Sequence, residues 1–128
     1  MNNKLLWKLF ILLIILTGIV TLTLIAINGV ADHIHILIGL KPDMALSDLV
    51  RVIKSNSSKI INEKKFVRVK FNWQEGFGAF SYSHSQLSTV IKYIENQEKH
   101  QNKTTFNNEY LELLKKYAVE YDSKYLFK

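Results

Sequence analysis

The chain has 128 residues, which is the size of one small domain. It contains no cysteine, so disulfide frameworks and zinc-thiolate sites are excluded. The formal net charge is +6 and the isoelectric point is about 9.5. A basic balance suits an anionic partner, but it does not choose between a nucleic acid and an anionic membrane surface.

The N-terminus is apolar. Residues 9–27 form a run of 19 residues without a charge, which is long enough for a transmembrane helix. Lys4 and Lys8 would hold its start inside the cell, yet the Lys- and Arg-rich remainder opposes export. The run is therefore either a membrane anchor or a foreign N-terminus, and a buried soluble helix is the simplest alternative. On this view residues 1–28 form an apolar helix and residues 29–128 form the domain.

A strand bearing two histidines is predicted next. Residues 31–40 read ADHIHILIGL, and apolar side chains occupy every second position. A period of two is typical of a strand with one apolar face, so His33 and His35 project side by side from the other face. Two imidazoles this close can share one cation, although such a pair is often only a surface feature.

A helix and a second strand are predicted in the middle of the chain. The helix is expected over about 47–62, with Ser47 as its N-cap, because apolar side chains recur at helical spacing. Residues 66–74 alternate again and predict a strand. By default the basic side chains here are solvated. A nucleic-acid groove would use them for phosphate contacts: Arg51, Lys54, Lys59, Arg68 and Lys70.

The last third of the chain is predicted to be helical. Ser83 and Gln86 form a capping-box pattern, and the helix that follows carries Tyr93 and Gln97 on one face. A final helix is expected over about 105–117, and the aromatic tail is expected to pack back on the domain.

These side chains suit metal-assisted chemistry on a phosphate. The carbonyl oxygen of Gln97 is a neutral, hard donor, which fits Mg²⁺ or Mn²⁺ better than Zn²⁺. If the Tyr93 helix packs over the histidine strand, Gln97 completes the metal site. A tyrosine hydroxyl has a pKa of about 10 and needs such a metal to attack a phosphate at neutral pH. Taken alone, however, two such residues on a helix are usually an exposed pair.

Three segments together resemble a known family. The segment ADHIHILIGL is similar to the histidine-hydrophobe-histidine strand of the HUH endonuclease superfamily. Residues 71–83, FNWQEGFGAFSYS, resemble the Trp-Gln-x-Gly-aromatic segment of insertion-sequence-200-like tyrosine transposases. Residues 93–97, YIENQ, resemble the segment that carries their nucleophile. The resemblance covers about residues 29–128.

The resemblance implies a fold, an activity and partners. The fold would be α+β, a ferredoxin-like antiparallel sheet with helices packed on it. His33, His35 and Gln97 would bind Mg²⁺ or Mn²⁺, and Tyr93 would be the nucleophile. Tyr82 is the rival nucleophile, but no glutamine follows it four residues later. The activity would be DNA transposition, by cleavage and rejoining of single-stranded DNA through a 5′-phosphotyrosine. Hairpin-bearing DNA and a second copy of the chain are the implied partners, and in some members the tyrosine helix serves the partner subunit's metal site.

The N-terminus departs from the family pattern. A strand, a helix and a further strand normally precede the histidine strand, and here the apolar run stands in their place. The histidine strand would then have an unpaired edge. Two other functions stay open: an inactive, truncated transposase remnant, and a membrane-anchored protein with a repurposed domain. The resemblance predicts a cytoplasmic, DNA-associated protein, whereas the apolar run predicts a membrane location.

Overall fold

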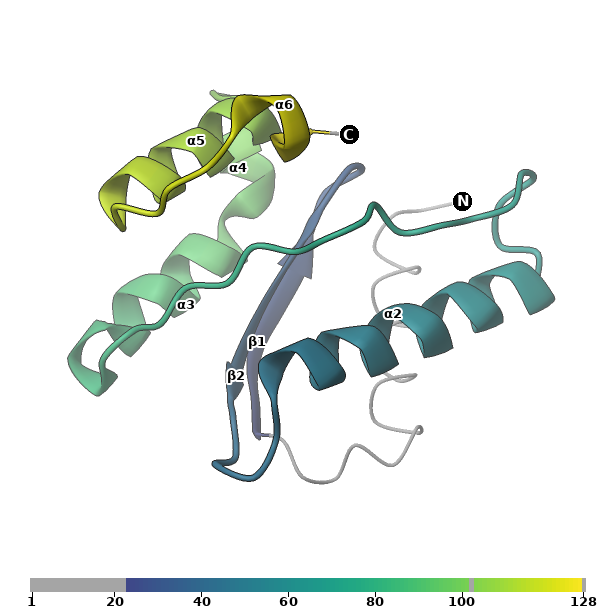
Figure 1. Cartoon of the computed structure of the whole chain (residues 1–128), viewed down its shortest axis with the longest axis horizontal. Helices are drawn as coiled ribbons and strands as arrows, with labels where there is room; N and C mark the ends of the chain where they lie inside the picture. The colour runs from purple at the N-terminus through teal and green to yellow at the C-terminus, as the bar shows by residue number, and fades with distance from the viewer. Residues whose placement is uncertain (1–22, 102, 128) are drawn as a thin grey trace. The chain divides into compact units, whose positions relative to one another are not determined.

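The computed structural model describes residues 23–101 and 103–127, and its fold class is the predicted α+β (Figure 1). In chain order the elements are β1 (Thr23–Gly29), β2 (Ile34–Gly39), α2 (Leu46–Glu63), the 3₁₀ turn η1 (His84–Gln86), α3 (Leu87–Glu95), α4 (Gln97–Gln101), α5 (Phe106–Lys116) and α6 (Ser123–Leu126). They belong to two compact units. The first contains Ile38–Phe77 and the second contains Ala26–Leu37 with Gly78–Lys128.

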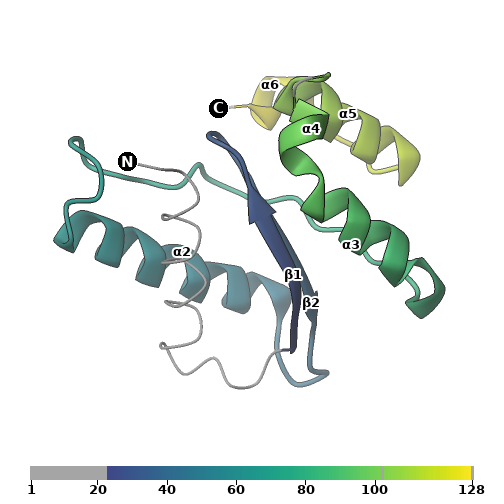
Figure 2. The same cartoon turned by 180° about the vertical axis from the view of Figure 1, so that it is seen from behind.

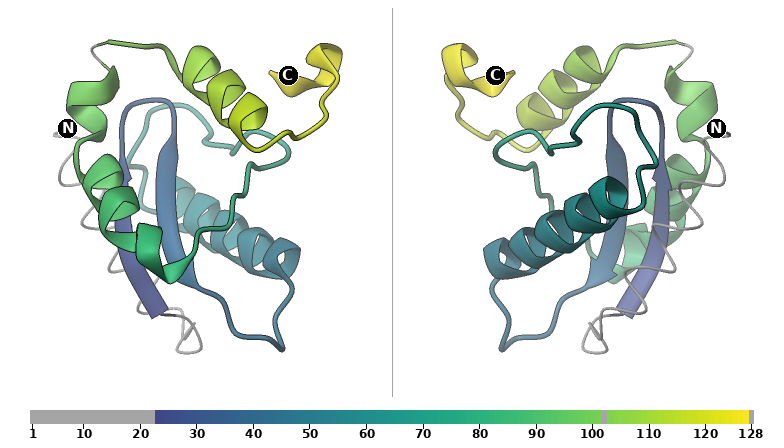
Figure 3. Two further views of the ribbon diagram at one scale, coloured as in Figure 1. Left: turned by 90° about the vertical axis from the view of Figure 1, so that its left-hand side faces the viewer. Right: turned by 90° about the vertical axis from the view of Figure 1, so that its right-hand side faces the viewer.

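The two strands pair with each other in a two-stranded sheet (Figure 3). A tight turn joins them, in which the Val30 amide donates a hydrogen bond of 3.0 Å to the His33 carbonyl, so they run antiparallel. The predicted histidine strand is confirmed, although it begins only at Ile34. β1 pairs with one edge of this strand, and among the described residues no strand pairs with its other edge, in agreement with the predicted unpaired edge.

Strand β1 comes from the end of the apolar run. Thr23–Ile27 was predicted to be helical, and this is wrong, because these residues lie in an extended strand. Their mixture of β-branched and other apolar side chains suits a half-buried strand better than a helix. Residues 1–22, the rest of the predicted apolar helix, lie outside the described residues. Within residues 23–101 and 103–127, no helix has the length and apolar character needed to span a membrane.

The first unit is built on α2, which buries Leu49 and Ile61. The predicted Ser47 N-cap is wrong, because the helix begins at Leu46 and its N-cap is Ala45, which makes no side-chain hydrogen bond. The second strand predicted over residues 66–74 is wrong, because this segment is irregular.

Side chains of α2 hold the irregular segment. The Asn62 amide nitrogen donates to the Phe71 carbonyl at 2.9 Å, and its oxygen accepts from the Phe71 amide at 2.7 Å. The Trp73 indole nitrogen donates to Ser57 Oγ at 2.8 Å. A side chain thus satisfies backbone groups that a neighbouring strand would otherwise bind.

The second unit has its apolar core at Val90, Ile94 and Leu114. The predicted capping box is confirmed, since the Ser83 amide donates to Gln86 Oε1 at 3.0 Å at the start of η1 and α3. Figure 2 shows α3 leading into α4. The helix that carries Tyr93 ends at Glu95, and Gln97 opens the next helix, so the two residues are not on one continuous helix.

Candidate active site

The two histidines predicted to bind a metal lie together in the second unit. His33 immediately precedes β2 and His35 is its second residue. Their ring centroids are 5.0 Å apart and nearly perpendicular. His33 is buried, and the Phe106 ring lies against it at 4.6 Å between centroids. The Asp32 carboxylate contacts His33 Nδ1 at 2.7 Å, which directs Nε2 toward the interior.

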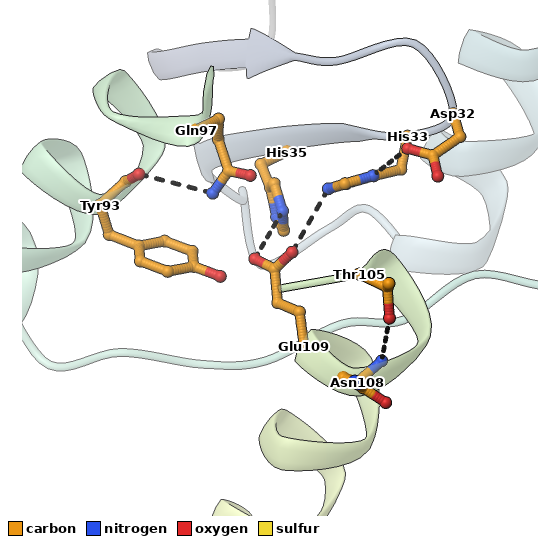
Figure 4. A network of polar contacts seen from close by, with 8 residues as sticks. All are labelled: Asp32, His33, His35, Tyr93, Gln97, Thr105, Asn108 and Glu109. Carbon is orange, nitrogen blue, oxygen red and sulfur yellow. Dashed lines mark hydrogen bonds and ion pairs between the residues drawn. The ribbon is translucent and has the colours of Figure 1, made fainter. Parts of the chain in front are cut away.

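A carboxylate that the sequence reasoning missed lies between the histidines. Glu109 Oε2 is 3.5 Å from His33 Nε2, and Oε1 is 3.4 Å from His35 Nε2 (Figure 4). The Glu109 side chain is only 4% exposed. Its position in the sequence could have indicated this role. Glu109 lies three residues after Phe106, on the apolar stripe of the last predicted helix, and a charged residue that is buried there needs a partner.

The charges of these groups depend on one another. Burial alone raises the pKa of Glu109, but the adjacent His33 and His35 imidazoles outweigh it and lower the pKa from 4.5 to about 2. Burial alone lowers the pKa of His33, but contacts with Glu109 and Asp32 outweigh it and raise the pKa above 6.5. Glu109 is therefore an anion at neutral pH.

Gln97 and Tyr93 also reach this cluster. The Gln97 side chain is fully buried, and its nitrogen makes a long hydrogen bond of 3.4 Å to the Tyr93 carbonyl. In Figure 4 the Gln97 amide faces His35, and the Tyr93 hydroxyl points toward Glu109 and His35. The Tyr93 and His35 rings meet edge to face, with centroids 5.7 Å apart. The structure therefore brings all four predicted site residues together in one chain.

Two contacts position the elements that carry these side chains. The Asn28 amide of β1 donates to the carbonyls of Ile94 and Glu95, at 2.9 and 3.3 Å, and so fixes the end of α3. On α5, Thr105 caps the N-terminus by accepting from the Asn108 amide at 3.4 Å. Phe106 then stacks on Tyr110, whose centroid is 5.7 Å away.

The segment that precedes η1 approaches α5 closely at Gly78. A Cβ atom built on Gly78 would lie 2.6 Å from the Tyr110 ring. Farther along, Phe80 and Tyr82 pack on Tyr117 at 5.0 and 5.7 Å between ring centroids. The tail follows the same pattern, since Phe127 contacts the Phe106 and Tyr110 rings, so the prediction that the aromatic tail packs back on the domain is confirmed.

The five predicted phosphate-binding residues lie in the first unit. Arg51 and Lys59 are exposed and pair with Asp48 and Glu63 one turn away on α2. Arg68 and Lys70 are exposed. The Lys54 ammonium donates to the carbonyls of Gln74 and Gly76, so it helps to hold the irregular segment. Arg51 and Lys54, with Trp73 and Phe77, line an open groove of about 520 Å³.

The rival tyrosine has a different environment. Burial, and then the neighbouring Tyr117, raise the pKa of Tyr82 well above its usual value of 10.0. A raised pKa makes the hydroxyl harder to ionise and a poorer nucleophile. Tyr93, by contrast, lies against His35.

Comparison with known families defines the class of protein as a transposase. The chain matches the family described as Transposase IS200 like over residues 7–97. It therefore belongs to the IS200-like transposase family, whose partner is DNA. The matched range includes the apolar run and ends at Gln97, so Glu109 lies beyond it. No curated protein and no solved structure matches the chain.

The buried donor atoms fit the divalent metal that this family implies. His33, His35 and Glu109 each offer one ligand atom, and these atoms lie within 4.8 Å of one another. His35 Nε2 and Gln97 Oε1 are buried and have no hydrogen-bond partner among the described residues. Buried polar atoms without hydrogen bonds are costly, and a cation shared with the Glu109 carboxylate, which lies 3.4 Å from His35 Nε2, would satisfy both atoms.

The Asp32 carboxylate is expected to strengthen metal binding by orienting His33. We expect Asp32→Asn to weaken Mn²⁺ binding by roughly tenfold, because the amide holds the required tautomer less firmly. Isothermal titration calorimetry with MnCl₂ measures the change. Asp43→Asn is the matched control, since Asp43 is an exposed residue outside the cluster. Equal weakening by both substitutions would show a general charge effect.

Acid is expected to weaken the metal-free fold through Glu109. Its pKa is lowered from 4.5 to about 2, so the stabilisation is present above pH 4.5 and is lost as the pH falls toward 2. Over this interval we expect the wild type to lose roughly 3 kcal/mol more unfolding free energy than Glu109→Gln. Urea titrations in EDTA at stepped pH values measure this, with Glu112→Gln as the control. Parallel pH profiles for wild type and Glu109→Gln would contradict the prediction.

Proposed function

We propose that this transposase cleaves and rejoins single-stranded DNA, with Tyr93 as the nucleophile and a divalent cation held by His33, His35 and Gln97. The observation that carries the proposal is the position of the Tyr93 hydroxyl, which points toward the buried cluster of metal-binding side chains (Figure 4). Mg²⁺ and Mn²⁺ are the favoured ions, because the donors include a hard amide oxygen.

The metal site and the tyrosine have separate roles. A divalent cation supplies polarisation of the scissile phosphate and stabilises the charge that develops in the transition state. The donor atoms come from the β1–β2 hairpin and from α4, in His33, His35 and Gln97. The fold of the protein therefore positions them, and bound DNA is not needed for this. The edge-to-face contact with His35 keeps the Tyr93 ring from turning away.

The chemical step exchanges one phosphodiester for another. The Tyr93 phenolic oxygen bonds to phosphorus and gives up its proton, while the bond from phosphorus to the 3′ oxygen breaks. The departing 3′ oxygen takes up a proton and becomes a hydroxyl. The product is a 5′-phosphotyrosine, and attack by a 3′ hydroxyl on it reverses the exchange. Rejoining therefore needs no nucleotide cofactor, because the energy of the broken bond is conserved in the phosphotyrosine.

The DNA partner is proposed to be a single strand with hairpin ends, bound by a homodimer in the cytoplasm. The net charge of +6 favours a polyanion. Arg51, Lys59, Arg68 and Lys70 are the proposed phosphate contacts, and their exposure supports this role. The support for Lys54 is weaker, because backbone carbonyls already bind its ammonium.

A denaturing gel tests the proposed function. The intact chain is incubated with labelled, hairpin-bearing single-stranded DNA and Mn²⁺. We expect a covalent protein–DNA band that survives denaturation and is absent when EDTA replaces the metal. An unstructured oligonucleotide of equal length and a hairpin-free duplex are the substrate controls. A folded chain that gives no band with any hairpin substrate would contradict the proposal.

A further inference from the structure

Glu109 has no role in the proposed chemistry, although it occupies the centre of the candidate site. Its carboxylate contacts both histidines, and its side chain is 4% exposed. It comes from α5, whereas the histidines come from the hairpin and Gln97 comes from α4. Three elements of the second unit thus converge on one point, and the charge placed there is negative.

The contacts between the Glu109 carboxylate and the two histidines are longer than ordinary hydrogen bonds. The carboxylate oxygens lie 3.5 and 3.4 Å from the two Nε2 atoms, whereas N–H···O hydrogen bonds usually measure about 2.7–3.2 Å. Two neighbouring donors of an octahedral ion, at about 2.1 Å and separated by about 90°, lie about 3.0 Å apart, so these contacts would shorten modestly when an ion binds. The ligand atoms of His33, His35 and Glu109 all lie within 4.8 Å of one another, close enough to be drawn around one ion.

Packing of the first turn of α5 also holds the Glu109 carboxylate in place. Phe106, one helical turn before Glu109, packs on the His33 ring and stacks on Tyr110. The cap at Thr105 fixes the start of the same helix. Glu109 therefore presents its oxygens to the histidines from a packed helix, whereas a surface glutamate would sample many rotamers.

We propose that Glu109 is a fourth, anionic ligand of the metal. This inference rests on the metal site of the proposed function and deepens it. The donor set becomes two imidazole nitrogens, one carboxylate oxygen and one amide oxygen. Two nitrogen donors favour Mn²⁺ over Mg²⁺, and the negative charge raises the affinity for either ion. The site should therefore bind its ion before DNA arrives, without help from the scissile phosphate.

Metal binding without DNA tests the proposal. The intact chain is titrated with MnCl₂, and free Mn²⁺ is followed by its electron paramagnetic resonance signal. We expect Glu109→Gln to bind Mn²⁺ at least about tenfold more weakly than the wild type. Glu112→Gln is the matched control, because it removes an exposed carboxylate from the same helix and should change nothing. Far-UV circular dichroism checks that each variant is folded.

The opposite result has a clear meaning. If Glu109 is only a counter-ion of protonated histidines, it must withdraw before a metal binds, and Glu109→Gln would bind Mn²⁺ more tightly. An equal or tighter affinity overturns the proposal. Glu109→Asp is the second variant, since it keeps the charge but shortens its reach. Weakening by Glu109→Asp supports ligation, whereas unchanged affinity would indicate only a long-range charge effect and would overturn it.

A spectroscopic measurement separates ligation from electrostatic help. With the site saturated by Co²⁺, the visible bands report the coordination sphere. We expect these bands to change in Glu109→Gln and to stay the same in Glu112→Gln; identical bands in all three proteins would overturn the proposal. The proposed function is tested separately, because adduct formation and Mn²⁺ affinity are independent measurements. Tyr93→Phe should keep wild-type Mn²⁺ affinity and form no covalent adduct.

Discussion

Tyr93→Phe is expected to abolish the covalent DNA adduct, a loss of at least about 10³-fold in the rate of its formation. The substitution removes only the hydroxyl that is proposed to attack phosphorus. The ring remains, so its edge-to-face contact with His35, at 5.7 Å between centroids, is kept. Labelled hairpin DNA, Mn²⁺ and a denaturing gel measure the rate. Thermal melting should be nearly unchanged, which would show that the loss is chemical.

Tyr82→Phe is the matched control for this experiment. Tyr82 lies against Tyr117, and burial followed by that neighbour raises its pKa, so it is poorly suited to attack. We expect Tyr82→Phe to retain the adduct. An adduct formed equally well by Tyr93→Phe and lost in Tyr82→Phe would reverse the assignment of the nucleophile.

His35→Ala is expected to reduce Mn²⁺-dependent cleavage by at least about 100-fold. The substitution removes a nitrogen donor that faces Glu109 and is buried without a hydrogen-bond partner among the described residues. It also removes the ring against which Tyr93 packs. Cleavage is measured as a function of MnCl₂ concentration, and high concentrations should recover only part of the activity.

His84→Ala tests whether the effect belongs to the cluster. His84 is exposed and begins the 3₁₀ turn η1, so its loss should leave cleavage and Mn²⁺ affinity unchanged. If both variants lose activity equally, general damage to the protein would explain the result. If His35→Ala keeps full activity, the histidine pair does not bind the catalytic metal.

The histidine strand and the start of the tyrosine helix were predictable because their signals are local, whereas the partner strand β1 was not predicted. Alternation over residues 31–40 predicted β2, and Ser83 with Gln86 predicted the start of α3. The strand predicted over residues 66–74 failed, although the alternation was just as regular. A strand also needs a neighbour, and here the Asn62 side chain binds both backbone groups of Phe71.

Glu109 shows what local patterns miss. Its position on an apolar stripe signalled that it needed a partner, but only the fold shows that the partners lie more than seventy residues earlier. The break between Tyr93 and Gln97 is similar. Spacing placed them one turn apart, whereas Asn96 ends α3 and donates its own side chain to the Lys92 carbonyl at 2.7 Å.

The Asn28 side chain donates to the carbonyls of Ile94 and Glu95, and this contact bears on which subunit supplies the residues of each site. It ties the tyrosine helix to the same hairpin that carries the histidines, so one polypeptide holds the proposed nucleophile and the proposed metal donors. In a dimer, each subunit would then own a complete catalytic centre. A subunit that lost its tyrosine would gain nothing from an intact neighbour, and mixed dimers would retain half of their centres.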